Sequence, residues 1–190
     1  MNPGVLLTAA ALLLGSAAAQ AQDVTARLQA CAACHGAAGH APLANAPTLA
    51  GQPRVFLENQ LVMIREGLRD IPVMKGMLDG VSDADLIAMS THFAQQPIKP
   101  QPGPRDAALF ARGEQVANGN RCASCHLPGY AGREQMPRLA GQREDYLLHS
   151  MRQFQNNQAT GRDTIMAASL YGIADADVKA MAHYFAHLPP

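Results

Sequence analysis

The order of apolar and polar residues along the chain is typical of helices. Leu57, Leu61, Ile64 and Leu68 recur at intervals of four, three and four residues, which places them on one stripe of a helix. Pro53 comes just before this stripe, and proline suits the first turn of a helix. Few β-branched residues stand in alternating runs, so the pattern predicts an all-α protein.

A second helical pattern lies near the end of each half of the chain. In the first half, Leu86, Met89 and Phe93 share one face, and Ser82 is a good N-cap for the helix that carries them. The second half holds a matching apolar set: Val178, Met181, Phe185 and Leu188. The pattern therefore predicts that both halves end in an equivalent helix.

The two halves are copies of one unit. Three motifs recur in the same order, with an offset between 90 and 92 residues. They are Cys31-Ala-Ala-Cys34-His35 and Cys122-Ala-Ser-Cys125-His126, Pro47-Thr-Leu-Ala-Gly-Gln52 and Pro137-Arg-Leu-Ala-Gly-Gln142, and Ser82-Asp-Ala-Asp-Leu86 and Ala174-Asp-Ala-Asp-Val178. The proline-rich segment 98–104 between the copies reads as a linker, because proline continues neither a helix nor a sheet. We predict domains at 23–97 and 105–190.

The first 21 residues have the pattern of a signal peptide. An uncharged, apolar run from Val5 to Ala19 is followed by Ala19-Gln20-Ala21, a triplet suited to signal peptidase. We expect export to the periplasm and a mature chain that begins near Gln22. The alternative is a retained membrane anchor, although the run is shorter than the roughly 20 residues that span a bilayer.

All four cysteines fall within the two Cys-x-x-Cys-His motifs. On a helical turn, the first and fourth positions share a face, so both sulfurs of a motif reach one edge of a haem and form thioethers. The following histidine then points an imidazole at the iron, and this motif is typical of c-type haem attachment. We predict two covalent haem c groups, held by Cys31, Cys34, Cys122 and Cys125, with His35 and His126 as iron ligands.

Three other kinds of site could use these cysteines. Zinc sites use cysteine and histidine, but the two pairs lie 91 residues apart, far beyond ordinary zinc spacings. A thioredoxin-like pair needs a βαβ setting that the pattern lacks. Two disulfides would suit an oxidising compartment. None of the three explains why a histidine follows both pairs.

The sixth iron ligand is predicted from the repeat. Met74 and Met166 are equivalent positions, each eight residues before the start of the last helix motif, and we expect them in loops. Met77 is the rival in the first domain. Met89 and Met181 also match, but their place on an apolar helix face favours a core role. Iron with both histidine and methionine bound is closed to other ligands, which suits electron transfer.

Two prolines lie where they could orient the histidines. Pro47 and Pro137 follow His35 and His126 by 12 and 11 residues. Each offers a carbonyl to the second imidazole nitrogen, or alternatively only shapes its loop. The long non-periodic stretches 36–51 and 127–141 are expected to wrap the haem. The other histidines, His40, His92, His149, His183 and His187, have no equivalents in both halves, so surface or packing roles are favoured.

The charges of the chain are balanced, with 15 Lys and Arg against 15 Asp and Glu. Because no basic tract stands out, nucleic acid is not an expected partner. Residues 23–97 hold 5 basic and 7 acidic residues, and residues 98–190 hold 10 and 8. This difference suggests that the two ends dock with different redox partners.

With these motifs, the chain resembles the two-haem cytochromes of the c-four type, which are tandem class I cytochrome c domains. The resemblance rests on the motifs above together with Met74-Lys-Gly-Met-Leu78 and Asp163-Thr-Ile-Met166. It implies distal ligation by Met74 and Met166, histidine partners at Pro47 and Pro137, and two haems close together across the domain interface. It also implies a periplasmic carrier, free or loosely associated with the membrane, that passes electrons from a donor complex to a terminal oxidase or reductase.

Two rival functions remain at this point. One is the cytochrome subunit of a dehydrogenase, such as a sulfide-oxidising flavoprotein, which shares the two-domain plan. The other is a di-haem enzyme of the thiosulfate dehydrogenase or peroxidase type, which needs an open or unusual iron site. The matching methionines and the lack of a spare cysteine make the enzyme the weaker alternative, so we do not expect catalytic residues.

Overall fold

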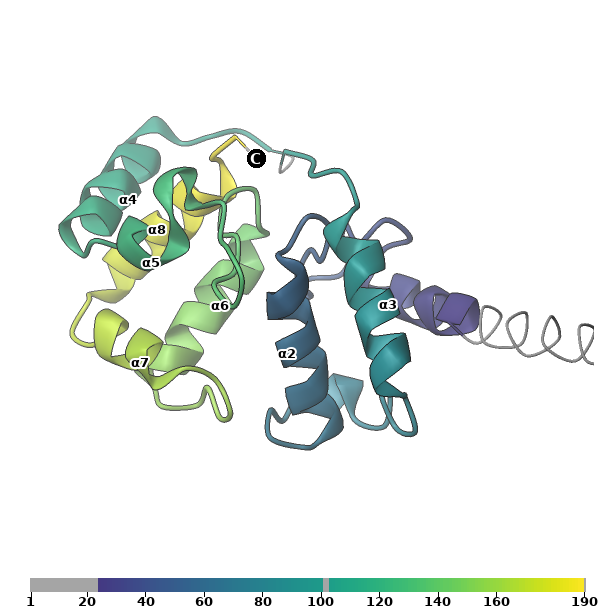
Figure 1. The fold of residues 1–190 in the computed structure, drawn as a ribbon. Helices are drawn as coiled ribbons and strands as arrows, with labels where there is room; N and C mark the ends of the chain where they lie inside the picture. The colour runs from purple at the N-terminus through teal and green to yellow at the C-terminus, as the bar shows by residue number, and fades with distance from the viewer. Residues whose placement is uncertain (1–23, 101–102, 190) are drawn as a thin grey trace, which may run out of the picture.

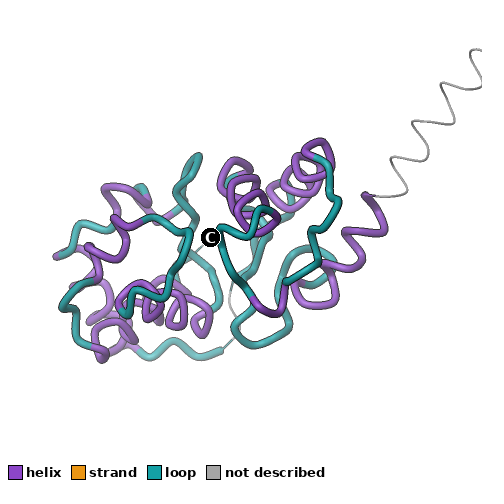
Figure 2. The backbone as a smooth tube through the Cα atoms, turned by 90° about the horizontal axis from the view of Figure 1, so that it is seen from below, coloured by secondary structure: helices purple, strands orange, loops and turns teal. Residues whose placement is uncertain are grey.

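The computed structural model describes residues 24–100 and 103–189. Within these residues the chain is helical, with one isolated β-bridge between Arg133 and Met136 and no strand (Figure 2). The prediction of an all-α fold is confirmed. The signal peptide predicted at 1–21 lies outside the described residues. Among the helices described, none has both the length and the apolar character needed to cross a membrane.

The helices form two groups, which Figure 1 shows side by side. The first group contains the helical residues 24–35, α2 (Arg54–Arg65), the 3-10 helix η1 (Pro72–Met74) and α3 (Asp83–Ala94). In this group α2 packs against α3. The buried centre of this group consists of Leu78, Val81, Leu86 and Met89. The partly buried residues that pack on it are Val24, Leu28, Cys31, Leu61 and Ile64.

The second group is built around its last helix. It contains α4 (Ala107–Gly119), α5 (Ala123–His126), η2 (Pro128–Tyr130), α6 (Glu144–Gln155), α7 (Thr164–Leu170) and α8 (Asp175–Ala186). Helix α8 packs against both α4 and α6, and α6 also contacts α7. Every residue of α8 from Ala180 to Ala186 is buried, so this helix forms the centre of the second core.

Most of the predicted apolar stripes face these cores. Leu57 is buried in α2, and Ser82 caps α3 by accepting a hydrogen bond from the Asp85 amide at 3.1 Å. Leu68 was placed on the α2 stripe wrongly, since α2 ends at Arg65 and Leu68 is 59% exposed. The cause is Gly67, whose φ of +68° turns the chain out of the helix.

The two groups are joined by reciprocal hydrogen bonds from side chains to backbone. Gln142 binds Thr48, donating from Nε2 to the carbonyl oxygen at 2.8 Å and accepting from the amide at Oε1 at 2.8 Å. Gln52 binds Arg138 in the same way, at 2.9 Å and 3.0 Å. All four residues are buried, and each has its repeat equivalent on the other side of the interface. The interface therefore has approximate two-fold symmetry.

Arg138 adds a contact that breaks this symmetry. Its guanidinium donates to the carbonyl oxygens of Ala50 at 2.7 Å and Gly51 at 3.3 Å in the first group, and also to Ala140 in its own group. Burial lowers the pKa of Arg138 to about 10, which still leaves the side chain charged at neutral pH. Backbone dipoles solvate this buried charge at the interface.

Candidate functional site

Both Cys-x-x-Cys-His motifs lie on helical turns, as predicted. In the first group, Cys31 to His35 close the helical stretch 24–35. In the second group, Cys122 is the N-cap of the short helix α5, which ends at His126. The first cysteine of each motif is half-buried, the second is exposed and the histidine is buried. Equivalent residues of the two motifs are therefore buried to similar extents.

The chain turns sharply after each histidine. The next residue has a left-handed backbone in both groups, with φ of +75° at Gly36 and +69° at Leu127. Only glycine adopts this conformation freely, so Leu127 holds it at a cost of order 1–3 kcal/mol. This turn leads into the loops that bring Pro47 and Pro137 back to the histidines.

Each histidine is fixed by a proline carbonyl. Nδ1 of His35 lies 2.9 Å from the Pro47 oxygen, and Nδ1 of His126 lies 2.9 Å from the Pro137 oxygen. A carbonyl only accepts hydrogen bonds, so both Nδ1 atoms carry the proton and both Nε2 atoms keep a lone pair. Burial lowers the pKa of both imidazoles, and the hydrogen bonds to proline oppose this only in part. Both histidines are therefore neutral at pH 7, the form that binds a metal.

The site in the second group contains an unpaired buried atom. Nε2 of His126 is buried and has no hydrogen-bond partner among the residues that the structure describes. A buried polar atom left without a partner costs about 1–3 kcal/mol, so this arrangement needs an explanation. A haem iron bound at Nε2 would supply one, because the atom is aimed away from the proline and carries the free lone pair. The residues present therefore fit a c-type haem.

The four cysteines are free thiols. None of the four cysteines forms a disulfide in the structure. Burial raises the pKa of Cys31 and Cys122, so these two thiols are protonated at neutral pH. Because the thiolate is the reactive form of cysteine, this environment does not favour a reactive redox pair.

The two methionines predicted as distal ligands both lie in short helices. Met74 is the last residue of η1, and Met166 is the third residue of α7, so the prediction that both lie in loops was wrong. Short helices replace the loops because proline begins η1, while Asp163 caps α7 by accepting from the Ile165 amide. Both methionines are partly buried, whereas Met77 is 47% exposed. Met89 and Met181 lie at the centres of the two cores, in keeping with the core role predicted for them.

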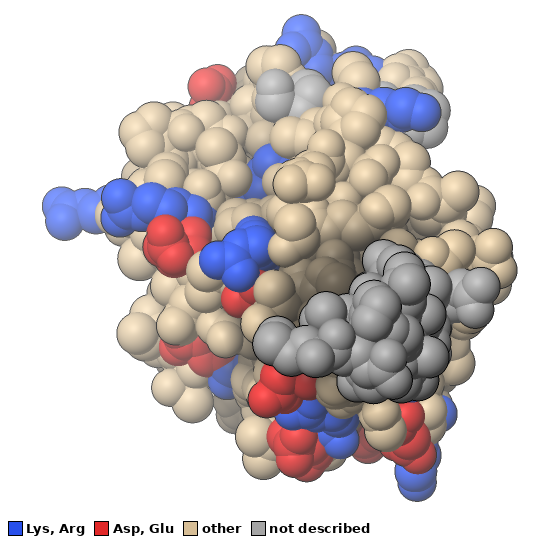
Figure 3. Space-filling view, turned by 45° about the vertical axis from the view of Figure 1, so that its right-hand side comes forward, with Lys and Arg blue, Asp and Glu red and all other residues tan. Residues whose placement is uncertain are grey.

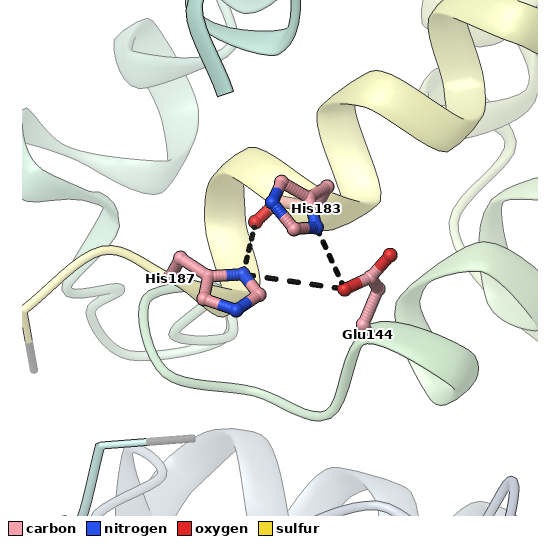
Figure 4. A group of neighbouring side chains, drawn as sticks. All are labelled: Glu144, His183 and His187. Carbon is pink, nitrogen blue, oxygen red and sulfur yellow. Dashed lines mark hydrogen bonds and ion pairs between the residues drawn. The ribbon is translucent and has the colours of Figure 1, made fainter. Parts of the chain in front are cut away.

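Figure 4 shows a further group with the spacing of a metal site, formed by Glu144, His183 and His187. Their ligand atoms lie within 4.8 Å of one another. The Asp106 amide donates to Nε2 of His183 at 3.0 Å, so Nδ1 of His183 carries the proton and donates to Glu144 at 2.9 Å. Nδ1 of His187 likewise donates to the His183 carbonyl oxygen at 2.9 Å. Protonated nitrogens do not ligate metal, so we interpret the group as a packing bridge from α8 to the starts of α4 and α6.

On the face shown in Figure 3, basic and acidic side chains are interspersed around uncharged areas.

The residues that the sequence did not reveal lie at the interface between the two groups, namely Gln52, Gln142 and Arg138. The repeated Pro-x-Leu-Ala-Gly-Gln motif marked both glutamines, but their contacts depend on the packing of the two groups.

Comparison with known proteins identifies the family. A family model described as cytochrome c matches residues 110–189. The chain is 33% identical to cytochrome c4 of Pseudomonas aeruginosa, and the alignment covers 95% of this chain and 94% of that protein. The chain belongs to the cytochrome c4 family. The resemblance seen in the sequence is confirmed, and with it the expectation of covalent haem c and electron transfer.

The chain is also similar to two further proteins over most of its length. A crystal structure of reduced recombinant cytochrome c4 from Pseudomonas stutzeri superposes with a TM-score of 0.79 at 31% identity, covering 88% of this chain and 98% of that one. A protein of Thiomonas intermedia named thiosulfate dehydrogenase electron acceptor is 34% identical, over 84% of this chain and 78% of its own length. As a member of this family, the protein is a di-haem electron-transfer cytochrome.

Proposed function

We propose that each half of the chain is a haem-binding domain whose Cys-x-x-Cys-His motif holds one haem c. The thioether residues are Cys31, Cys34, Cys122 and Cys125, and the proximal iron ligands are His35 and His126. The observation that carries this proposal is the buried, unpaired Nε2 of His126, whose Nδ1 is held by the Pro137 carbonyl. The same hydrogen bond to Pro47 supports the equivalent role for His35.

The residues of the chain prepare a site for one-electron exchange. Bound haem supplies a couple between ferric and ferrous iron. The proline carbonyls hold the imidazole tautomer and orientation, so the ligands need little rearrangement when an electron arrives or leaves. We assign Met74 and Met166 as distal ligands, because they are repeat equivalents and both are partly buried. A filled sixth position excludes exogenous ligands and favours a carrier over a catalyst.

Carbon monoxide tests the distal ligands. The reduced wild-type protein should show low-spin c-type spectra that carbon monoxide leaves unchanged. Met74→Ala and Met166→Ala should each open one haem to carbon monoxide, while the exposed Met77→Ala should open none. If wild-type protein binds carbon monoxide readily at one haem, or if Met77→Ala opens the first site in place of Met74→Ala, the assignment is wrong.

The partners we propose are redox proteins of the periplasm. The carrier would take electrons from a donor complex or dehydrogenase and pass them to a terminal oxidase or reductase. The similarity to a thiosulfate dehydrogenase electron acceptor supports a dehydrogenase as one donor. Rapid reduction of the protein by such a purified dehydrogenase would favour this role, and co-purification with a flavoprotein would favour a subunit of that enzyme. Export is tested by the intact mass of the protein, which should match a chain that begins near Gln22.

A further inference from the structure

The two interface glutamines touch the same peptide groups that hold the histidines. The Pro47 carbonyl, which accepts from Nδ1 of His35, and the Thr48 amide, which donates to Gln142, are two ends of one peptide bond. The peptide between Pro137 and Arg138 is shared in the same way by His126 and Gln52. Each histidine is thereby connected through a single peptide to a glutamine of the other domain.

Such a chain of hydrogen bonds is cooperative. When a peptide donates its N–H, its carbonyl oxygen gains negative charge and accepts more strongly. A stronger acceptor at Nδ1 makes the imidazole a more basic ligand, as outer partners do at other metal sites. Because Thr48, Arg138 and both glutamines are 2–3% exposed, water does not compete for these bonds, and their polarisation is screened little.

We propose that Gln142 and Gln52 are positioning residues that set the basicity of the proximal histidine in the opposite domain. Gln142 acts on His35, and Gln52 acts on His126. The inference rests on the proposed function, in which these histidines bind iron. A more basic imidazole favours ferric iron, so each glutamine lowers the reduction potential of the haem across the interface. The two haem environments are thus linked through backbone peptides, in a crossed arrangement.

A role confined to holding the domains together predicts something different. Loss of Gln142 would then loosen the whole interface and affect both histidines to similar extents, or mainly residues of its own domain. The crossed effect is therefore the distinguishing feature. Gln155 provides a matched control, because its Nε2 donates to the carbonyls of Leu170 and Ile173 within the second domain and touches neither proline peptide.

The experiment uses the two-haem protein and its Gln142→Met, Gln52→Met and Gln155→Met variants. Methionine keeps the length of the side chain while removing its amide. The readouts are the NMR shift of each histidine Nδ1–H in the reduced protein and the individually assigned reduction potentials. Gln142→Met should move the His35 proton upfield and raise the potential of that haem, with His126 nearly unchanged. Gln52→Met should give the mirror image, and Gln155→Met neither effect.

Equal shifts at both histidines, shifts confined to the variant's own domain, or no shift would overturn the relay. If Gln142→Met does not accumulate as folded two-haem protein, Gln142→Asn takes its place. Its amide is one methylene shorter, and the same crossed direction is expected at smaller size. Failure of the proposed function looks different, because the unmodified protein would then lack two covalent haems or show no ligand resonances from His35 and His126.

Discussion

Helices α4 and α8 approach closely at Gly113, and replacing this residue with alanine tests how tightly the second group is packed. A Cβ atom at this position would lie 2.1 Å from the Ala180 carbonyl oxygen and 2.5 Å from the Tyr184 Cβ. The carbonyl belongs to the backbone of a fully buried stretch of α8, so no side-chain rotation relieves the clash. The helices would have to separate by about 1.4 Å to restore a contact near 3.5 Å.

The expected cost follows from two opposing effects. Overpacking a close helix contact costs about 1–3 kcal/mol, and a clash with rigid backbone lies at the upper end of this range. Alanine regains about 1 kcal/mol over glycine through its helix propensity. The net loss in unfolding free energy is about 2 kcal/mol, which corresponds to a Tm lower by about 10 °C for a domain of this size.

Gly119 is the matched control, since it lies at the end of the same helix with no atom near its would-be Cβ. Gly119→Ala should leave stability unchanged or raise it by up to about 1 kcal/mol. Thermal unfolding of the two-haem protein, followed by circular dichroism and by haem absorbance, measures both variants. A Gly113→Ala protein as stable as Gly119→Ala would refute the close approach of the two helices.

Two more predictions concern a helix cap and an interface carboxylate. Ser82→Ala should lower the unfolding free energy by about 1 kcal/mol, because it removes the cap of α3. Ala174→Ser adds a hydroxyl at the uncapped start of α8 and should raise the unfolding free energy by a similar amount. Urea titrations measure both variants, and equal effects would contradict the cap assignment. Burial opposes ionisation of Asp145, but hydrogen bonds from Arg143, from the Asn45 amide across the interface and from the next amide in α6 outweigh it and lower its pKa. Its contribution to stability is therefore present above the ordinary carboxyl pKa of about 3.9 and is lost as the pH falls through the lower folded-state value. Asp145→Asn should be less stable than wild type at pH 7, with the difference shrinking below pH of about 4; a difference that stays constant to pH 2 would refute this.

Local signals were enough to predict much of the fold. The spacing of Leu57, Leu61 and Ile64 identified α2, and Ser82 identified the start of α3, because helix faces and caps depend on residues a few positions apart. The prediction failed at Leu68, where the apolar spacing continues but Gly67 ends the helix. The apolar spacing favours a longer helix and the glycine favours its end. The left-handed conformation of Gly67 ends the helix.

The residues of the candidate site could be predicted where they stand together in a contiguous motif, as in the two Cys-x-x-Cys-His motifs. The prolines were singled out by their distance from the histidines and by the family resemblance, and the structure supplies the hydrogen bonds at 2.9 Å. Gln52, Gln142 and Gly113 were not assigned roles, since each depends on a partner far away in sequence. A glutamine bound to backbone 86 to 94 residues distant leaves no pattern of its own.

The reciprocal glutamine contacts also bear on how a duplicated chain diverges. Gln52 binds Arg138, and Gln142 binds Thr48, which is the repeat equivalent of Arg138; this is the reciprocity of an isologous dimer. An ancestral single unit that paired with itself through these bonds would need only a tether to become the present chain. Because each glutamine recognises the N–H and C=O of its partner and not the side chain, the partner position was left free to vary. Threonine occupies it in one copy and arginine in the other, and the same backbone contact joins the two halves at both positions.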